Sequence, residues 1–346
     1  QQGKALWLTL SDFYIASSSK SYLLMNKYYD YCSYESIKYI IYAGPRFIEL
    51  DIFRKSFNED DNIPVVTNGV ELGEWKLCLN DLCLAKCLKI INDLALDDKI
   101  SSANENPFIL YLNIHINSEL SENANKNIYD KHGDFRFFNA IATMIDNNIS
   151  SSYLLKSEHN SYNEFQYLKP TGSSNVNHNT PLHLVNIYEL KNKLIIMSNV
   201  TGSCSNLGDY INFVCPQDST KNQYTRNIKN FNNGEIKGVY DIDALRNNNK
   251  NQLSYVYEES DKNALSNYSS GHGFMLGCQI QSMYYQSNDV NFQNYLGQTW
   301  SSTELYGKQQ NKGPLIGNFK KCSFILKPAK LRNTYEELSK FTISSI

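Results

Sequence analysis

The fold is decided by the stretch Phe47-Ile48-Glu49-Leu50-Asp51-Ile52-Phe53, an apolar run that contains two carboxylates. Successive side chains of a strand point to opposite faces, so Glu49 and Asp51 share one face. A buried carboxylate pair needs a cation, either a metal ion or a basic side chain. At the C-terminal end of an early barrel strand, such a pair favours a functional site over a structural ion pair.

Similar short runs of β-branched and aromatic residues recur along the chain and predict further strands. With the first run they cover residues 13–15, 47–53, 63–66, 108–115, 194–197, 239–242, 253–257 and 278–285. Helical spacing of apolar residues appears at 36–41 and 77–96. Strands that alternate with helices predict an α/β fold with a parallel sheet, and we expect a TIM-type (β/α)8 barrel.

The domain organisation follows from a change in composition. Residues 199–237 are rich in Asn, Gly, Ser and Thr and lack a sustained apolar period, which predicts a long ordered insertion. It would divide one barrel domain over 1–346 into a half at 1–198 with five strands and a half at 238–335 with three, followed by a tail at 336–346. The polar stretches 117–134 and 160–180 are predicted to be surface loops.

Charge and composition exclude several classes of protein. Lys and Arg number 33 against 35 Asp and Glu, so the net charge of -2 argues against nucleic-acid binding through bulk charge. No apolar run approaches the roughly 18 residues of a membrane span, and the first residues do not read as a signal peptide. The eight Cys lack zinc-site spacing, which predicts free thiols in a reducing intracellular compartment or a virion.

Several motifs then resemble phosphoinositide-specific phospholipase C. The sequences FYIASSSKSYL at 13–23, AGPRFIELD at 43–51 and PVVTNG at 64–69 resemble the X catalytic box of that family. In the second half, LSYVY at 253–257, SNY at 266–268, GCQI at 277–280 and ILKP at 325–328 look like its Y box. The resemblance implies a barrel of the phospholipase C-like phosphodiesterase kind, in which two histidines and calcium cleave phosphoinositides.

The departures from the family pattern fall where its chemistry lies. By the resemblance, Ser19 and Asn68 stand where the family has its catalytic histidines. The four calcium positions fall on Lys20, Glu49, Asp51 and Asn113, and only the two carboxylates keep the family's residue type. We therefore expect no calcium and no other cofactor. Instead, the ammonium group of Lys20 is expected to occupy the vacated position beside the carboxylates.

The substrate pocket has changed as well. By the same resemblance, Met197 and Asn199 stand where the family has two phosphate-binding lysines, and Tyr255 stands where it has an arginine. Tyr257 keeps the ring that would stack on inositol. Because these cations are missing, we do not expect the protein to bind phosphoinositide membranes. His115 also has a counterpart in the family's fourth strand, and we expect it to be structural.

Three functions remain open from the sequence. The first is a catalytically inactive phospholipase C-like barrel that acts as a structural or binding component of a larger assembly and contacts other protein subunits through 199–237. An Asn-rich composition would suit a virion component, for example of a giant virus, or an assembly from another AT-rich source. The second is a divergent, metal-independent phosphodiesterase or phospholipid-headgroup binder. The third is an inactive barrel that docks on membranes through Tyr28, Tyr29, Tyr31 and Tyr34.

Overall fold

The computed structural model describes residues 8–56, 62–70, 75–96, 105–116, 132–155, 182–200, 205–215, 228–259, 262–297, 319–320 and 322–333. The predicted tail at 336–346 and the predicted loop at 160–180 lie outside these residues, as does most of the predicted loop at 117–134.

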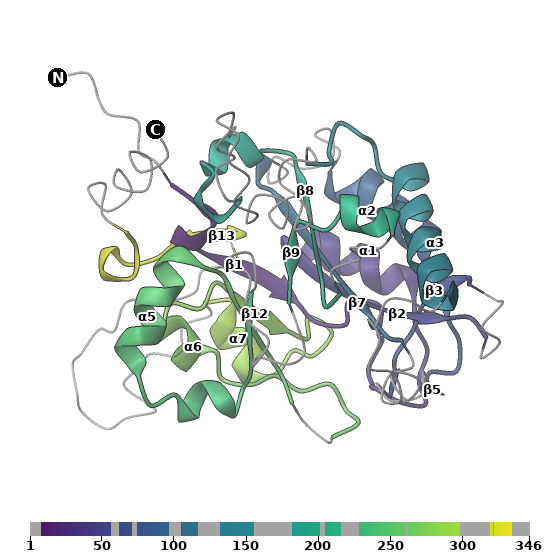
Figure 1. Ribbon diagram of the computed structural model, residues 1–346. Helices are drawn as coiled ribbons and strands as arrows, with labels where there is room; N and C mark the ends of the chain where they lie inside the picture. The colour runs from purple at the N-terminus through teal and green to yellow at the C-terminus, as the bar shows by residue number, and fades with distance from the viewer. Residues whose placement is uncertain are drawn as a thin grey trace, which may run out of the picture.

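A curled, mostly parallel sheet forms the centre of the molecule (Figure 1). Along its main path, every neighbouring pair of strands is parallel. The strands of this path follow one another in space in chain order, and they are β1 (Phe13–Ser18), β2 (Phe47–Arg54), β7 (Phe108–Ile114), β8 (Leu194–Ser198), β9 (Phe213–Val214), β10 (Lys229–Asn232), β11 (Ser254–Tyr257) and β12 (Ile280–Met283). Strand β12 returns to β1, so the order is that of a (β/α)8 barrel.

The seam of the barrel lies between β9 and β10. There the amide of Ile228 donates a hydrogen bond to the carbonyl of Val214 at 2.8 Å. Antiparallel strands attach at two other places: β3 (Pro64–Val66) joins β2 and β6 (Leu82–Cys83), and β13 (Phe324–Leu326) joins β1. A separate hairpin consists of β4 (Gly69–Val70) and β5 (Trp75–Lys76).

Helices cover the outside of the sheet in two groups (Figure 1). Near β2 and β7 lie α1 (Tyr34–Ala43), α2 (Leu84–Ala95) and α3 (His132–Asn148). The second group, on the side of β12, consists of α5 (Ile242–Asn251), α6 (Gly271–Met275) and α7 (Val290–Tyr295). The Ser33 side chain caps the N-terminus of α1. Gly44 caps its C-terminus, where a φ of 99° suits a residue without Cβ. Short 3-10 helices occur at Leu10–Asp12, Leu182–Leu184, Ile187–Leu190, Asn206–Asp209, Glu235–Gly238 and Ala329–Leu331.

Two apolar layers follow from the alternation of side chains along the strands. One layer fills the inside of the barrel with residues such as Phe47, Tyr111 and Met197. The other packs the alternate residues, such as Ile48 and Leu50, against the helices. Because the strands are buried on both faces, they read in the sequence as nearly continuous apolar runs.

The predicted fold class is confirmed, but three strand assignments are corrected. Residues 239–242 are not a strand, because Asp241 caps α5 by accepting a hydrogen bond from the Ala244 amide at 2.9 Å. Two barrel strands, β9 and β10, lie within the predicted insertion at 199–237. The predicted strand at 63–66 is antiparallel to β2 and therefore lies beside the barrel path. Within the described ranges, no helix has the length and apolar character to cross a membrane.

Candidate functional site

A cluster of polar side chains lies at the C-terminal ends of β1, β2 and β7. Phe47, Glu49 and Asp51 alternate onto the inner face of β2, where Phe47 belongs to the barrel interior and the two carboxylates follow it. In the parallel register, Glu49 pairs with Tyr111 and Asp51 with Asn113. The sheet itself therefore brings three predicted site residues together.

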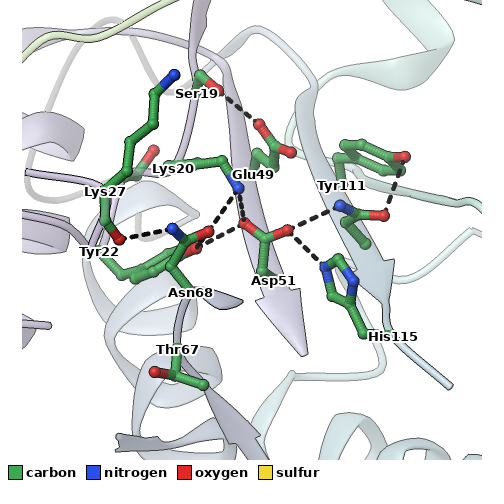
Figure 2. Close-up of polar contacts among 12 residues, drawn as sticks. Ser19, Lys20, Tyr22, Lys27, Glu49, Asp51, Thr67, Asn68, Tyr111 and His115 are labelled. Atoms are coloured by element: carbon green, nitrogen blue, oxygen red, sulfur yellow. Dashed lines mark hydrogen bonds and ion pairs between the residues drawn. The ribbon is translucent and has the colours of Figure 1, made fainter. Parts of the chain in front are cut away.

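Lys20 enters the cluster from the turn after β1 (Figure 2). Its φ of 42° is uncommon for a residue with a side chain, and its carbonyl accepts hydrogen bonds from the Leu23 amide and from Gln286. Its Nζ donates to Asp51 Oδ2 at 3.0 Å and to Asn68 Oδ1 at 2.8 Å. The turn thus directs a cation at the carboxylate.

Asp51 is fully buried and is the centre of the network (Figure 2). Besides Lys20, the Tyr22 hydroxyl donates to Oδ2 at 2.6 Å. Oδ1 accepts from Asn113 Nδ2 at 2.7 Å and lies 2.8 Å from His115 Nε2. Because a carboxylate only accepts, Nε2 of His115 carries the proton. Each Asp51 oxygen therefore has two hydrogen-bond partners.

These contacts set the ionisation of Asp51. Burial alone would raise the pKa of its carboxyl group, but the charge of Lys20 and the hydrogen bonds from His115 and Tyr22 hold that pKa well below its usual value. Burial would likewise lower the pKa of Lys20, whereas the carboxylates of Asp51 and Glu49 raise it. The pair is therefore ionised across the neutral range.

Glu49 is in a different environment from Asp51. Its Oε2 accepts hydrogen bonds from Ser19 Oγ at 2.7 Å and from the Tyr255 hydroxyl at 3.2 Å. Burial and the negative charge of Asp51 raise the pKa of Glu49, against the opposing effects of Lys20 and the two hydroxyls. The pKa values of two carboxyl groups on one face of the strand are thus shifted in opposite directions.

Asn68 closes the network from the loop after β3. Its Oδ1 accepts from Lys20, and its Nδ2 donates to the carbonyl of Lys27 at 2.6 Å. Gly69 follows directly, where a Cβ would lie 2.0 Å from the Trp75 carbonyl oxygen. Only glycine fits this close approach of β4 to β5, which holds Asn68 in place.

The other predicted pocket residues are only partly in the cluster. Tyr255 reaches it through Glu49, and its ring stacks on Tyr257 with 5.7 Å between centroids. Met197 is buried in the barrel interior. Asn199 instead binds the backbone of Ile114, accepting from its amide at 2.8 Å and donating to its carbonyl at 2.9 Å. Asn199 thus holds the end of β7 in place.

Sequence reasoning missed one member of the cluster and underestimated another. Tyr22 belongs to the first motif but has no role predicted from the sequence, and its position two residues after Lys20 is the available signal for its hydrogen bond to Asp51. His115 was expected to be structural, and it joins the network through Asp51 while its ring stacks on Phe53 with 4.2 Å between centroids. The buried Nδ1 of His115 has no hydrogen-bond partner in the described part of the chain.

The oxygens of Asp51 are occupied by hydrogen-bond donors of the protein itself. Calcium takes six to eight oxygen ligands. Here Asp51 faces the N–H groups of Lys20, Asn113 and His115. Across the ranges described, no three His, Cys, Asp or Glu side chains are placed to share a metal ion.

The chain is similar to known proteins both in sequence, over its first part, and in fold. Residues 7–151 match the family model described as phosphatidylinositol-specific phospholipase C, X domain. Among solved structures, the chain is similar to PLC21 of S. officinalis, with a TM-score of 0.64 and 16% identity over 96% of this chain and 38% of that one. PLC21 of L. pealei matches with a TM-score of 0.63 and 16% identity over 96% of this chain and 39% of that one.

Identity at this level shows the fold alone. The chain spans about two fifths of the length of these two relatives. No curated protein matches the chain.

Proposed function

We propose that this chain, whose residues 7–151 match the model of the phosphatidylinositol-specific phospholipase C X domain, is a catalytically inactive phospholipase C-like barrel that acts as a structural or binding component of an assembly. The observation that carries the proposal is the position of Lys20 Nζ, 3.0 Å from Asp51 Oδ2 and 2.8 Å from Asn68 Oδ1. In this proposal an internal ammonium group replaces the metal ion.

The hydrogen bonds of Asp51 support the loss of calcium. A calcium ion would have to displace Lys20 and compete with the N–H groups of Asn113 and His115 for the same two oxygens. It would also add two positive charges beside an ammonium group that is already paired. Both effects oppose metal binding.

Proton transfer is also poorly supported. General acid and base groups each contribute about 10²–10⁴-fold to a rate. At the positions where the family resemblance expects imidazoles, the Ser19 hydroxyl donates to Glu49 and the amide of Asn68 is bonded at both ends. Neither group has an ordinary pKa near neutrality.

Recognition of a phosphorylated headgroup has little support from the residues at the end of β8. Met197 is buried among apolar side chains, and Asn199 is committed to the backbone of Ile114. A polyanionic ligand would find no ammonium or guanidinium group at these two positions.

A direct assay tests the inactive state. Vesicles containing phosphatidylinositol, with and without calcium, should release no inositol phosphate above the level without protein, and an active phospholipase C serves as the positive control. Steady release by the parent protein would contradict the proposal.

The alternative of a metal-independent phosphodiesterase is favoured by one observation. Glu49 and Asp51 have pKa values shifted in opposite directions, which is the arrangement of an acid and base pair. If this alternative holds, Ser19→Ala and Glu49→Gln should each abolish measurable release of inositol phosphate. An exposed variant, Glu35→Gln on α1, should leave that release unchanged.

We further propose that other subunits contact the chain through the segment 199–237 and the residues directly after it. In its described parts, Leu207, Phe213 and Ile236 are buried in the core, so only outward side chains are available for contact. Tyr240 follows the segment and is fully exposed, and exposed Tyr residues often anchor interfaces. Tyr240→Ala should reduce recovery of the tagged chain in high-mass particles from its source, whereas Tyr188→Ala, an exposed Tyr elsewhere, should not.

A further inference from the structure

Two cysteines from distant parts of the sequence meet beside the polar cluster. Cys32 lies between β1 and α1, and Cys78 lies between β5 and β6. Their segments are joined by backbone hydrogen bonds from the Tyr29 amide to the Leu77 carbonyl at 2.8 Å and from the Leu79 amide to the Asp30 carbonyl at 2.9 Å. The Cys32 amide also donates to the Asn80 side chain at 2.7 Å.

The two thiols approach the same short segment, because Cys32 lies against Thr67 and Cys78 lies against the Lys27 carbonyl, to which the Asn68 side chain also donates. Cys32 is buried, with 4% of its surface exposed, and its Sγ lies 3.8 Å from Thr67 Oγ1. Cys78 is partly exposed, and its Sγ lies 3.7 Å from the carbonyl oxygen of Lys27. One thiol is therefore accessible to a small oxidant, and the other lies behind it.

The pKa values of the two cysteines are shifted in opposite directions. The hydrogen bond from Cys32, together with that from the Asn68 amide and the charge of Lys20, lowers the pKa of Cys78 to about 7 against the opposing effect of burial. The same contact with Cys78, followed by burial, raises the pKa of Cys32. At neutral pH, Cys78 therefore carries a substantial thiolate fraction.

We propose that Cys32 and Cys78 are an oxidation site at which a hydroperoxide forms a disulfide that ties the loop after β1 to the segment after β5. The inference rests on the hydrogen-bonded pairing of the two segments, which brings both thiols to the Thr67–Asn68 segment, and on the partial exposure of Cys78. It is independent of whether the barrel catalyses hydrolysis.

The chemistry is balanced with one equivalent of hydrogen peroxide. The Cys78 thiolate attacks one peroxide oxygen, an S–O bond forms, and the O–O bond breaks to release hydroxide, which takes up a proton to become water. The Cys32 sulfur then attacks the resulting sulfenic acid, an S–S bond forms, and the S–O bond breaks while the Cys32 proton leaves with a second water. Two thiols are oxidised by two electrons, and the peroxide is reduced.

The site is connected to the polar cluster through Lys27 and Asn68. The carbonyl of Lys27 accepts from both Asn68 Nδ2 and the Cys78 thiol. Asn68 Oδ1 in turn accepts from Lys20. Oxidation should therefore change the environment of Lys20 through a short chain of hydrogen bonds.

The test uses the unmodified full chain. The folded protein is treated with one equivalent of hydrogen peroxide, remaining thiols are blocked with N-ethylmaleimide, and a protease digest is analysed by mass spectrometry without reductant. We expect a peptide pair joined through Cys32 and Cys78 that disappears after reduction. Cys83→Ser, which changes an exposed thiol at the start of α2, should leave the pair intact, and Cys78→Ser should abolish it.

The proposal is overturned if no Cys32–Cys78 peptide forms and Cys78 is found either alkylated by the maleimide after the peroxide treatment or oxidised only to sulfinic acid. It is also overturned if the main disulfide joins another pair, such as Cys83 and Cys87.

Discussion

Lys20 and Asp51 form an ion pair of 3.0 Å in which the carboxylate is fully buried and the lysine side chain is 21% exposed. The lysine reaches the carboxylate from the turn after β1, and the carboxylate lies on the inner face of β2. The ammonium group of Lys20 is therefore the cation that faces the carboxyl groups at this end of the barrel. The pair is central because removal of Lys20 leaves the buried charge of Asp51 without its ion-pair partner.

Lys20→Asn should lower the stability of the fold. Breaking a buried ion pair costs about 3–5 kcal/mol, and partial exposure of Lys20 should reduce the loss to about 1–2 kcal/mol. Denaturant unfolding at pH 7 measures the change. The control is Lys38→Asn, which removes the exposed i,i+3 pair with Glu35 and should cost less than about 0.5 kcal/mol. Equal effects of the two variants would mean that Lys20 does not pair with Asp51.

Glu49→Gln should stabilise the protein increasingly as pH rises. The folded state raises the pKa of Glu49 above its usual value of 4.5, so the ionised form is disfavoured by folding once pH exceeds that value. Gln resembles the protonated group and avoids this cost. The gain in melting temperature over the parent should therefore be larger at pH 8 than at pH 4.

The control for this prediction is Glu105→Gln. Lys191 lowers the pKa of Glu105, so this exposed variant should show a small change of the opposite sign. A Glu49→Gln protein that becomes less stable than the parent as pH rises would show that ionised Glu49 is stabilised by Lys20 and the hydroxyl groups.

Tyr22→Phe should cost more stability than Tyr14→Phe. Both hydroxyls are buried and donate at 2.6 Å, but Tyr22 donates to the Asp51 carboxylate and Tyr14 to the neutral carbonyl of Phe274. Hydrogen bonds to charged groups are worth about 1.5–3 kcal/mol, against about 0.5–1.5 kcal/mol for neutral ones. Urea unfolding measures the loss of unfolding free energy in each variant. A larger loss in Tyr14→Phe would show that the hydrogen bond from Tyr22 to Asp51 contributes little to stability.

Much of the fold could be predicted because the central strands carry their pattern locally. The apolar run around Glu49 and Asp51 is a strand with both faces buried, and the parity of its side chains alone placed the two carboxylates together. Strand β10, with the sequence Lys229-Asn230-Phe231-Asn232, could not be recognised in this way, since it is short and polar and is held by pairing with β11. The false strand at 239–242 shows the reverse case, where a β-branched run lies on the surface and precedes a helix.

The site could be predicted only where strands or the family pattern fixed the residues. Asn113 lies beside Asp51 because the parallel register of β2 and β7 pairs them. The positions of Tyr22 and Asn68 depend on how two loops return to the barrel end, which no periodicity records. Asn199 has the spacing of a pocket residue, but its side chain binds the backbone of Ile114, which lies beyond the last residue of β7 that pairs with β8.

Calcium titration of the parent protein and of Lys20→Asn tests the central claim most directly. The internal ammonium group should prevent metal binding, so calcium up to about 1 mM should produce no specific heat and no change in the melting temperature of the parent. In Lys20→Asn, the ammonium group is removed and the new amide side chain places an oxygen ligand beside two carboxyl groups. Calcium should therefore recover part of the stability that this variant loses. Binding of calcium by the parent at submillimolar concentration would contradict the account, because Lys20 would then not occupy the place of the metal.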